Sequence, residues 1–289
     1  MTQRTSSGLN QLRCLLLVFI AAWLAPSSAA TFQRVVSLAP SLTELVCALD
    51  ACQHLVGIDN ATDWPPRARE KPRVGDLYAP DLETILTLQP DLVLSTPYGG
   101  AALRLRQLGM KVVTIATDHY QDLYQAIDML GELLGQVPSA RRLAMRLRDQ
   151  VARIASSVAT LPRPRVYYEI DRTPYTAGGQ SYVSTLIEMA GGENIAAAFP
   201  ASYPRISPEF VLDAAPGVII LADAPHGVSA AEIAARPGWS NLPAVRDNRI
   251  CALKQTTVDV LHRPGPRIGT ALSALAECLH PNLNPNSQS

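Results

Sequence analysis

Few side chains in this sequence have the types and spacing that catalysis or metal binding requires. Its five histidines, at positions 54, 119, 226, 262 and 280, are scattered without the spacing of a metal-ligand set. The sequence contains no GxSxG nucleophile elbow and no HExxH zinc motif. We therefore predict no catalytic residue, no metal site and no enzymatic activity, with an exported hydrolase kept as a distant alternative.

The cysteines offer a different chemistry, which is cross-linking. Cys14 lies in the first 30 residues, and Cys47, Cys52, Cys251 and Cys278 follow. No CxxC occurs, so a redox enzyme has no support. An even number of cysteines in an oxidising compartment permits two disulfides. The pairs closest in sequence are Cys47 with Cys52 and Cys251 with Cys278, although the sequence alone allows three connectivities.

Residues 1–30 have the pattern of a secretory signal. Arg4 and Arg13 precede an apolar run at residues 15–25, which is followed by PSSAA. The run is too short for a membrane anchor, and Cys14 precedes it instead of ending it as in a lipoprotein. We predict cleavage near Ala30 and export to the periplasm.

The exported part of the chain has a small negative charge. Without Arg4 and Arg13, 25 − 2 = 23 basic residues face 25 acidic ones, a formal charge of −2. No basic run could follow a phosphate backbone, so nucleic acid is not an expected partner. About 260 residues exceed the commonest domain size, and two lobes are therefore expected.

Short β-branched runs alternate with helical patterns, which predicts parallel sheets with crossover helices. The spacing of Ser41 and Glu44 predicts a capping box that opens a helix ending near Leu49. We expect an N-terminal α/β lobe at 31–120, a connecting helical segment at 121–161 and a C-terminal α/β lobe at 162–289. The predicted strands are residues 34–38, 54–58, 91–95, 111–115, 165–170, 217–222 and 249–253.

Two distant stretches repeat one pattern. PDLETILTLQPDLVLS, from Pro80, and SPEFVLDAAPGVIIL, from Ser207, align at a constant offset of 209 − 83 = 126 when Glu83 is placed on Glu209. Each stretch predicts a helix that begins after an N-cap residue, followed by a proline and then an apolar strand. The pattern therefore predicts a duplicated lobe.

The segment between the lobes differs from both. From Pro138 to about Thr160 it has apolar residues at helical spacings and no internal glycine or proline. A helix of roughly 22 residues would be about 33 Å long, enough to cross from one lobe to the other. An ordinary surface helix within one domain is the alternative.

The motifs RVVSLAPSLTELVCAL, VGIDNATDWPP, PRVGDLYAPDLETILTLQPDLVL, AGGENI and RPGPRI resemble exported solute-binding proteins of the helical-backbone class. The resemblance is closest to the vitamin B12 (cobalamin) binders of ABC importers and runs from about Arg34 to His280. It implies two similar α/β lobes joined by a single long backbone helix, with the ligand in a cleft between them. It implies a monomeric receptor without a cofactor of its own, with a corrinoid as its transported ligand.

The resemblance also gives the repeated glutamates a role. Glu83 and Glu209 match the family's two docking glutamates, one on each lobe, which meet arginines of a homodimeric permease in the inner membrane. The alternative needs no partner: each carboxylate lies in a first helical turn and favours the positive end of the helix dipole, worth about 0.3–1 kcal/mol.

In the second lobe, three residues match ligand-binding positions of the B12 binders. Tyr203 stands where the family has an aromatic residue, and Asp259 and Arg263 stand where polar side chains bind the corrin's amide rim. A wide, flat ligand with an amide rim needs aromatic faces and a few hydrogen-bonding groups.

The first lobe departs from that pattern. Ala61, Leu77 and Thr96 stand where the best-known B12 binders have aromatic residues. Leu77 and the neighbouring aromatic residues Trp64, Tyr78 and Tyr98 are the ligand-binding residues we expect here. Trp64 could instead be a structural core residue.

Haem and ferric siderophores are the nearest alternative ligands. Tyr78, Tyr98 or His119 could bind haem iron. Anionic siderophores usually call for several arginines, and Arg263, Arg205 and Arg172 do not form a cluster in the sequence.

Overall fold

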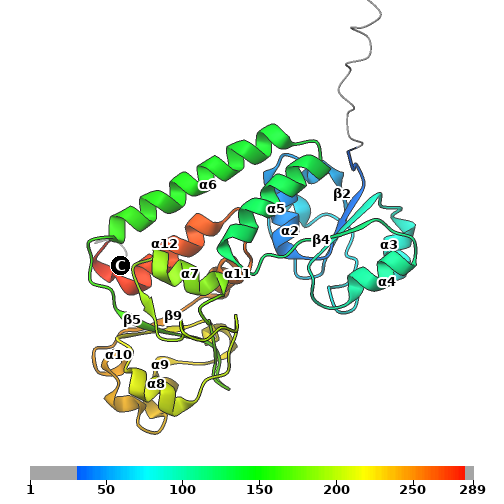
Figure 1. The fold of residues 1–289 in the computed structure, drawn as a ribbon. Helices are drawn as coiled ribbons and strands as arrows, with labels where there is room; N and C mark the ends of the chain where they lie inside the picture. The colour runs from blue at the N-terminus through cyan, green and yellow to red at the C-terminus, as the bar shows by residue number, and fades with distance from the viewer. Residues whose placement is uncertain (1–30, 284–289) are drawn as a thin grey trace, which may run out of the picture. The chain divides into compact units, whose positions relative to one another are not determined.

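The computed structural model describes residues 31–283, which form an α/β protein with two separate sheets (Figure 1). The predicted signal peptide, its cleavage site near Ala30 and residues 284–289 lie outside the described residues. The first sheet has four parallel strands in the order β2-β1-β3-β4. Their bounds are β1 (Val35–Ser37), β2 (Leu55–Ile58), β3 (Leu92–Ser95) and β4 (Val112–Thr114).

Helices connect these strands, because parallel neighbours need a crossover connection and cannot be joined by a tight hairpin. The first lobe contains α2 (Pro40–Ala48), α3 (Leu82–Thr87), α4 (Ala101–Gln107) and α5 (Tyr120–Leu133), with short 3₁₀ turns η1 (Cys52–His54) and η2 (Pro66–Ala68). Val35 and Leu92 on one face and Val36 and Val93 on the other are fully buried and belong to two different hydrophobic clusters, so the sheet is covered on both faces.

The second sheet has the order β6-β5-β8-β9, and β7 pairs with β5. Its strands are β5 (Arg165–Asp171), β6 (Tyr175–Thr176), β7 (Glu193–Asn194), β8 (Val218–Leu221) and β9 (Ile250–Ala252). All pairs are parallel except β5 with β6. Its helices are α7 (Tyr182–Met189), α8 (Pro208–Ala214), α9 (Ala230–Ala235), α10 (Pro243–Arg246), α11 (Gln255–His262) and α12 (Ile268–Leu279), with η3 (Ala224–His226), η4 (Trp239–Asn241) and η5 (Pro281–Leu283).

The sequence repeat is a structural repeat. Helix α3 and strand β3 begin at Leu82 and Leu92, and α8 and β8 begin at Pro208 and Val218, which is 126 residues later in both cases (208 − 82 and 218 − 92). Gln89 (φ 46°) and Ala215 (φ 45°) both adopt the left-handed conformation after the helix, again 215 − 89 = 126 apart. The same backbone path therefore ends each helix and leads into each strand.

Helix α6 (Val137–Val158), with 22 residues, is the long helix that the sequence predicts. It packs against α5 of the first lobe and against α7 and α12 of the second. Its buried face includes Leu143, Leu147, Val151 and Val158, while its arginines lie on the outer face. The two α/β lobes are thus joined by one long helix, as the fold class requires.

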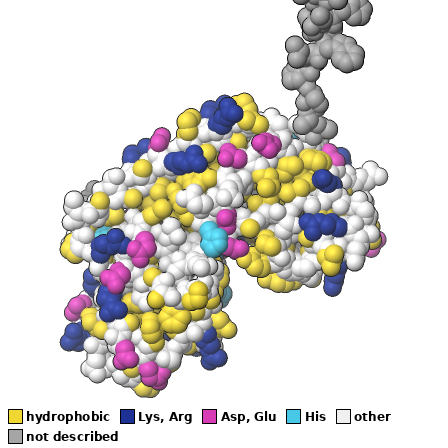
Figure 2. Space-filling view, in the orientation of Figure 1, with side chains coloured by type: hydrophobic (Ala, Val, Ile, Leu, Met, Phe, Trp, Pro, Cys, Tyr) yellow, Lys and Arg dark blue, Asp and Glu magenta, His cyan; other side chains and the backbone are white. Residues whose placement is uncertain are grey.

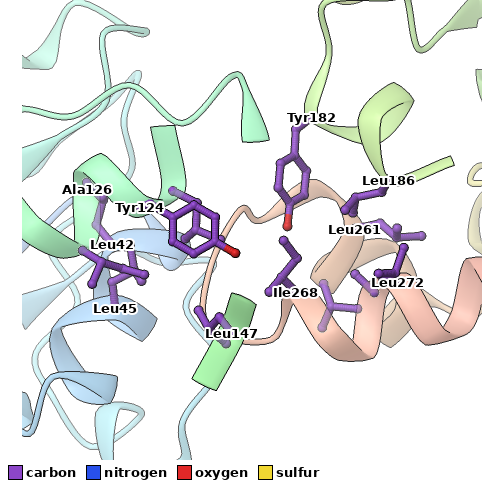
Figure 3. Close-up of a cluster of buried hydrophobic side chains, with 14 of the residues drawn as sticks. Leu42, Leu45, Tyr124, Ala126, Leu147, Tyr182, Leu186, Leu261, Ile268 and Leu272 are labelled. Atoms are coloured by element: carbon purple, nitrogen blue, oxygen red, sulfur yellow. The ribbon is translucent and has the colours of Figure 1, made fainter. Parts of the chain in front are cut away.

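The hydrophobic core continues from one lobe into the other. Figure 3 shows Leu42 of α2 and Tyr124 of α5 on one side, and Tyr182 of α7 and Leu272 of α12 on the other, with Leu147 of α6 beneath them. All five side chains are at most 4 % exposed. The lobes are therefore held by shared packing in addition to the covalent link through α6.

The predicted disulfides are confirmed. Cys47 is bonded to Cys52, which joins the end of α2 to η1, and Cys251 is bonded to Cys278, which joins β9 to α12. Each bond closes a local segment of one lobe.

The predicted capping box at Ser41 and Glu44 is wrong. The N-cap is Ala39, which makes no side-chain cap, and Pro40 occupies the first helical turn. Ser41 is therefore already inside the helix, and the Glu44 carboxylate faces a partner in the other lobe instead of the helix N-terminus.

Candidate ligand-binding cleft

Several first-lobe residues, among them the predicted ligand-binding residues Trp64 and Tyr98, follow the carboxyl ends of its strands. Ala61 and Trp64 come after β2, Thr96 and Tyr98 after β3, and Asp118 after β4. In a parallel sheet these ends share one edge, where ligands of α/β proteins usually bind. On the face drawn in Figure 2 the surface is hollowed between the two lobes, and acidic and histidine side chains gather at the upper edge of the hollow.

Tyr98 and Tyr203 approach each other from opposite lobes. Partial desolvation and a hydrogen bond to Asp118 raise the pKa of Tyr98 to about 12, and Tyr203 contributes to the same shift. Desolvation and Asp118 also raise the pKa of Tyr203. Both rings are about half exposed, at 51 % and 48 %. Two half-exposed tyrosines from different lobes, both influenced by the Asp118 carboxylate, are therefore available to a ligand.

Backbone contacts next to Asp118 tie the first lobe to the second. Its carbonyl accepts a hydrogen bond from the Tyr182 amide at 2.9 Å, and the His119 Nδ1 lies 2.5 Å from the Gln180 carbonyl oxygen. The His119 ring is thus engaged with the protein backbone, which leaves its Nδ1 unavailable to a haem iron.

Close backbone packing places the segment that carries Tyr203. The amides of Gly178 and Gly179 donate to the carbonyls of Ser202 and Phe199 at 2.9 and 3.0 Å. A Cβ at Gly179 would come within 2.0 Å of the Ala197 carbonyl oxygen. Only glycine allows this approach, so the pair of glycines fixes the loop that ends at Tyr203.

Arg263 and Asp259, both predicted to bind the ligand, form an ion pair with each other, and Arg263 also reaches the first lobe. Arg263 Nη2 donates to Asp259 at 3.2 Å, and Nη1 forms an ion pair with Asp63 at 2.5 Å. Nη2 also lies 3.4 Å from the Ala61 carbonyl oxygen. The Arg263 side chain is only 15 % exposed, so these partners determine its orientation.

Trp64 lies in a different environment from the tyrosines. Its ring, 43 % exposed, faces the Arg267 guanidinium at 5.6 Å, and it lines a cavity of about 240 Å³ with Glu44 and Cys47. This arrangement places Trp64 beside the ion pairs between the lobes. A ligand role for Trp64 stays a prediction.

Leu77 and Tyr78 lie on a loop next to Tyr98. The Asp76 carboxylate accepts from the amides of Tyr78 and Ala79 at 2.8 Å, which forms the turn. Gly99 packs so closely that a Cβ there would lie 2.3 Å from the Leu77 carbonyl oxygen. Tyr78 is 73 % exposed and Leu77 is partly buried, so both reach the surface near Tyr98.

Glu44 and Arg267 form a second ion pair between the lobes. Arg267 donates two hydrogen bonds to the carboxylate, Nε to Oε2 at 2.7 Å and Nη2 to Oε1 at 2.5 Å. The Glu44 side chain is 1 % exposed. Desolvation raises its pKa, while the Arg267 hydrogen bonds and charge oppose that rise. A carboxylate buried to this extent needs such a partner.

Carboxylates balance or exceed the positive charges along the cleft. Asp63 and Asp259 both bind Arg263, Glu44 pairs with Arg267, and Asp118 is close enough to Tyr98 and Tyr203 to raise the pKa of both. A polyanionic ligand would therefore meet little attraction here.

The repeated glutamates occupy matching positions outside the cleft. Glu83 and Glu209 are exposed residues of the first turns of α3 and α8, capped by Asp81 and Ser207. Thr84 donates to Asp81 at 3.0 Å and Phe210 donates to Ser207 at 3.1 Å. Both glutamates are consequently the second residue of a helix whose N-cap side chain accepts a backbone hydrogen bond.

Sequence reasoning missed Asp63, Asp118, Glu44 and Arg267. In the two ion pairs, Asp63 with Arg263 and Glu44 with Arg267, the partners are 200 and 223 residues apart in sequence. No local sequence pattern therefore reveals them. One signal was available: Glu44 interrupts an apolar stretch of α2 in which Leu42, Leu45 and Val46 are all buried.

A separate buried cluster lies at the carboxyl ends of β5 and β8. Glu169, fully buried, binds Arg236 through two hydrogen bonds of 2.6 and 2.7 Å. Asp223 is 4 % exposed, and neither of its carboxylate oxygens has a hydrogen-bond partner. Desolvation and then the Glu169 carboxylate raise the pKa of Asp223. Arg236 hydrogen-bonds to Glu169 and not to Asp223, so one positive charge faces two close carboxyl groups. This arrangement favours the protonated form of Asp223.

Cavities elsewhere do not coincide with the predicted ligand residues. One of about 590 Å³ is lined by residues 161–164 and 279–282 with Gly217 and Arg249. Another, of about 360 Å³, lies beside Glu209 and is lined by Leu212, Pro237 and Trp239. Neither includes Tyr203 or Arg263, and the open cleft is the better candidate because aromatic and polar groups converge there.

With this geometry in place, the class of protein is clear. The periplasmic binding protein family model matches residues 35–257, and the chain belongs to that family. None of the helices in residues 31–283 has the length and apolar character needed to cross a membrane.

Similar proteins bind two kinds of tetrapyrrole. The vitamin B12-binding protein of Vibrio parahaemolyticus is 30 % identical over 250 residues, covering 85 % of this chain and 88 % of its own. The periplasmic vitamin B12-binding protein BtuF of Vibrio cholerae has a TM-score of 0.72 at 28 % identity, covering 86 % and 96 % of the two chains. The periplasmic heme-binding protein RhuT of Roseiflexus sp. RS-1, in apo form, has a TM-score of 0.74 at 27 % identity, covering 88 % and 100 %.

The raised pKa of Asp223 predicts a pH dependence of stability. The unfolded chain releases this proton near the ordinary pKa of 3.8, and the folded protein holds it to higher pH. The folded state therefore binds more protons in that window and loses stability as the pH rises through it. We expect Asp223→Asn, which cannot titrate, to gain thermal stability relative to the unmodified protein as the pH rises from about 4 to about 7, between the unfolded and the folded pKa of Asp223.

Thermal unfolding followed by circular dichroism across this pH range measures the effect. Asp128→Asn, at an exposed site of α5, controls for loss of one negative charge. A stability difference for Asp223→Asn that does not change with pH would show that the folded protein does not retain this proton.

Proposed function

We propose that this protein is the solute receptor of an ABC importer and that its ligand is cobalamin or a related corrinoid. The observation that carries the proposal is Arg263, which is paired with two carboxylates, in a cleft to which Tyr98 and Tyr203 contribute from opposite lobes. A corrinoid has a broad face for aromatic contact and a rim of neutral amides, which suits such a cleft. The similarity to vitamin B12-binding proteins supports the same ligand.

Each ligand-binding residue has a role in this proposal. Tyr98 and Tyr203 supply aromatic surfaces, with Tyr78 and Leu77 at the edge of the first lobe. Arg263 donates hydrogen bonds to carbonyl groups of the amide rim, and Asp259 accepts them from its N–H groups. Because the receptor releases its ligand unchanged, it needs no catalytic residue and no cofactor.

Haem is the second candidate, favoured by the similarity to a periplasmic heme-binding protein. Haem carries two propionate carboxylates, and its iron takes a protein ligand such as tyrosine or histidine. The exposed Tyr78 hydroxyl could fill that role. The carboxylates around Arg263 disfavour propionates, which is why we place the corrinoid first.

Glu83 and Glu209 are the docking residues for the permease in this proposal. The two glutamates have the same helix position and the same type of cap, so they can meet equivalent arginines of a homodimer. A monomeric receptor with two matching acidic sites fits such a partner. Export to the periplasm completes the proposal.

Titration calorimetry of residues 31–289 with cyanocobalamin tests the ligand. We expect saturable one-to-one binding in the micromolar range or tighter, and Tyr203→Ala to weaken it at least about tenfold through loss of aromatic contact. Met145→Ala, on the exposed side of α6, is the matched control. Binding of haemin but not of cyanocobalamin would contradict the corrinoid assignment and keep the receptor class.

Charge reversal tests docking separately from ligand binding. We expect Glu83→Arg and Glu209→Arg to abolish uptake of labelled cyanocobalamin by cells carrying the importer, because each replaces an attractive charge with a repulsive one. Glu70→Arg, another exposed glutamate, should leave uptake unchanged. Loss of ligand affinity in the purified Glu83 or Glu209 variants would argue against a docking role.

A further inference from the structure

Asp63 is the first-lobe residue that meets Arg263 across the cleft. It lies between β2 and η2, and its carboxylate is 2.5 Å from Arg263 Nη1, 200 residues away in sequence. The Asp63 side chain is 52 % exposed and the Arg263 side chain 15 % exposed. The carboxylate can therefore be reached from solvent, while the guanidinium is held in place.

Two carboxylates share this one guanidinium. Asp63 binds Nη1, Asp259 binds Nη2 at 3.2 Å, and Gln255 donates to the same Asp259 oxygen at 3.0 Å. One positive charge thus faces two negative charges. An arginine whose donors already bind carboxylates has less to offer an incoming carboxylate, because bidentate pairing requires two free N–H groups.

We propose that Asp63 determines ligand specificity by positioning and neutralising Arg263. With Asp63 present, Arg263 presents a fixed donor to the carbonyl of a neutral amide and does not attract an anion. Without it, the guanidinium gains a free edge and the cleft loses one negative charge. The cleft then favours an anionic tetrapyrrole such as haem. This inference rests on the proposed function for the identity of the preferred ligand.

Affinities of haemin and cyanocobalamin, measured in parallel at two salt concentrations, test the inference. For Asp63→Asn we expect the ratio of the two affinities to move toward haemin by about tenfold, a moderate shift because water screens this half-exposed pair. Haemin binding by this variant should weaken more with salt than that of the unmodified protein. Asp63→Glu, which keeps the charge, should restore the original ratio.

Asp128→Asn controls for net charge, since it removes one negative charge from α5 without touching Arg263. An equal shift in Asp128→Asn and Asp63→Asn, or a failure of Asp63→Glu to restore the ratio, would overturn the inference. If Asp63→Asn does not fold, Asp259→Asn replaces it, and its haemin affinity must rise for the inference to stand.

The test separates this inference from the proposed function. If the unmodified protein binds haemin and not cyanocobalamin, the corrinoid assignment fails. The change in haemin affinity from Asp63→Asn still decides whether Asp63 restrains Arg263.

Discussion

The ion pair between Glu44 and Arg267 is the constraint on which the arrangement of the lobes depends. Glu44 is a carboxylate in the middle of an apolar helix, and burial without a partner would be severely destabilising. Its partner lies at the start of α12, in the other lobe. The charge is satisfied only when the α11–α12 loop is packed against α2, so the folded protein favours one relative position of the lobes.

Other contacts reinforce that position. Arg263, on the same α11–α12 loop, forms a second ion pair with Asp63 of the first lobe. The Tyr182 amide also donates a hydrogen bond to the Asp118 carbonyl. The shared core beneath them, with Leu147 of α6 between the helices of both lobes, excludes water from the junction. Because the walls of the cleft are already positioned, a ligand spends little of its binding free energy on ordering the protein.

The sequence predicted what local patterns and duplication determine. All seven predicted strands lie within a residue or two of their expected positions, although the two-residue strands β6 and β7 were not predicted. The repeat at an offset of 126 is present in the backbone itself, and the disulfides join cysteines that are close in sequence or on adjacent elements. The single long helix also follows from its uninterrupted apolar spacing. These features depend on contacts within one lobe or one helix.

The sequence could not predict contacts between distant segments. The spacing of Ser41 and Glu44 fits a capping box, and only the tertiary position of Arg267 explains why Glu44 does not cap. Family resemblance pointed to Tyr203 and Arg263, but it did not reveal that Asp63 and Asp118 would be their neighbours. The contact between Trp64 and Arg267 could not be predicted either, because it depends on how the lobes pack against each other.

Ion pairs and a shared core hold the cleft in its ligand-ready form. Electron–electron distance measurements between spin labels at Leu103→Cys on α4 and Asp213→Cys on α8, both exposed, test it directly. We predict that saturating cyanocobalamin changes the mean distance by less than about 2 Å, and that Glu44→Gln broadens the distance distribution. A wide, ligand-dependent closure in the unmodified protein, with Glu44→Gln behaving identically, would contradict the claim.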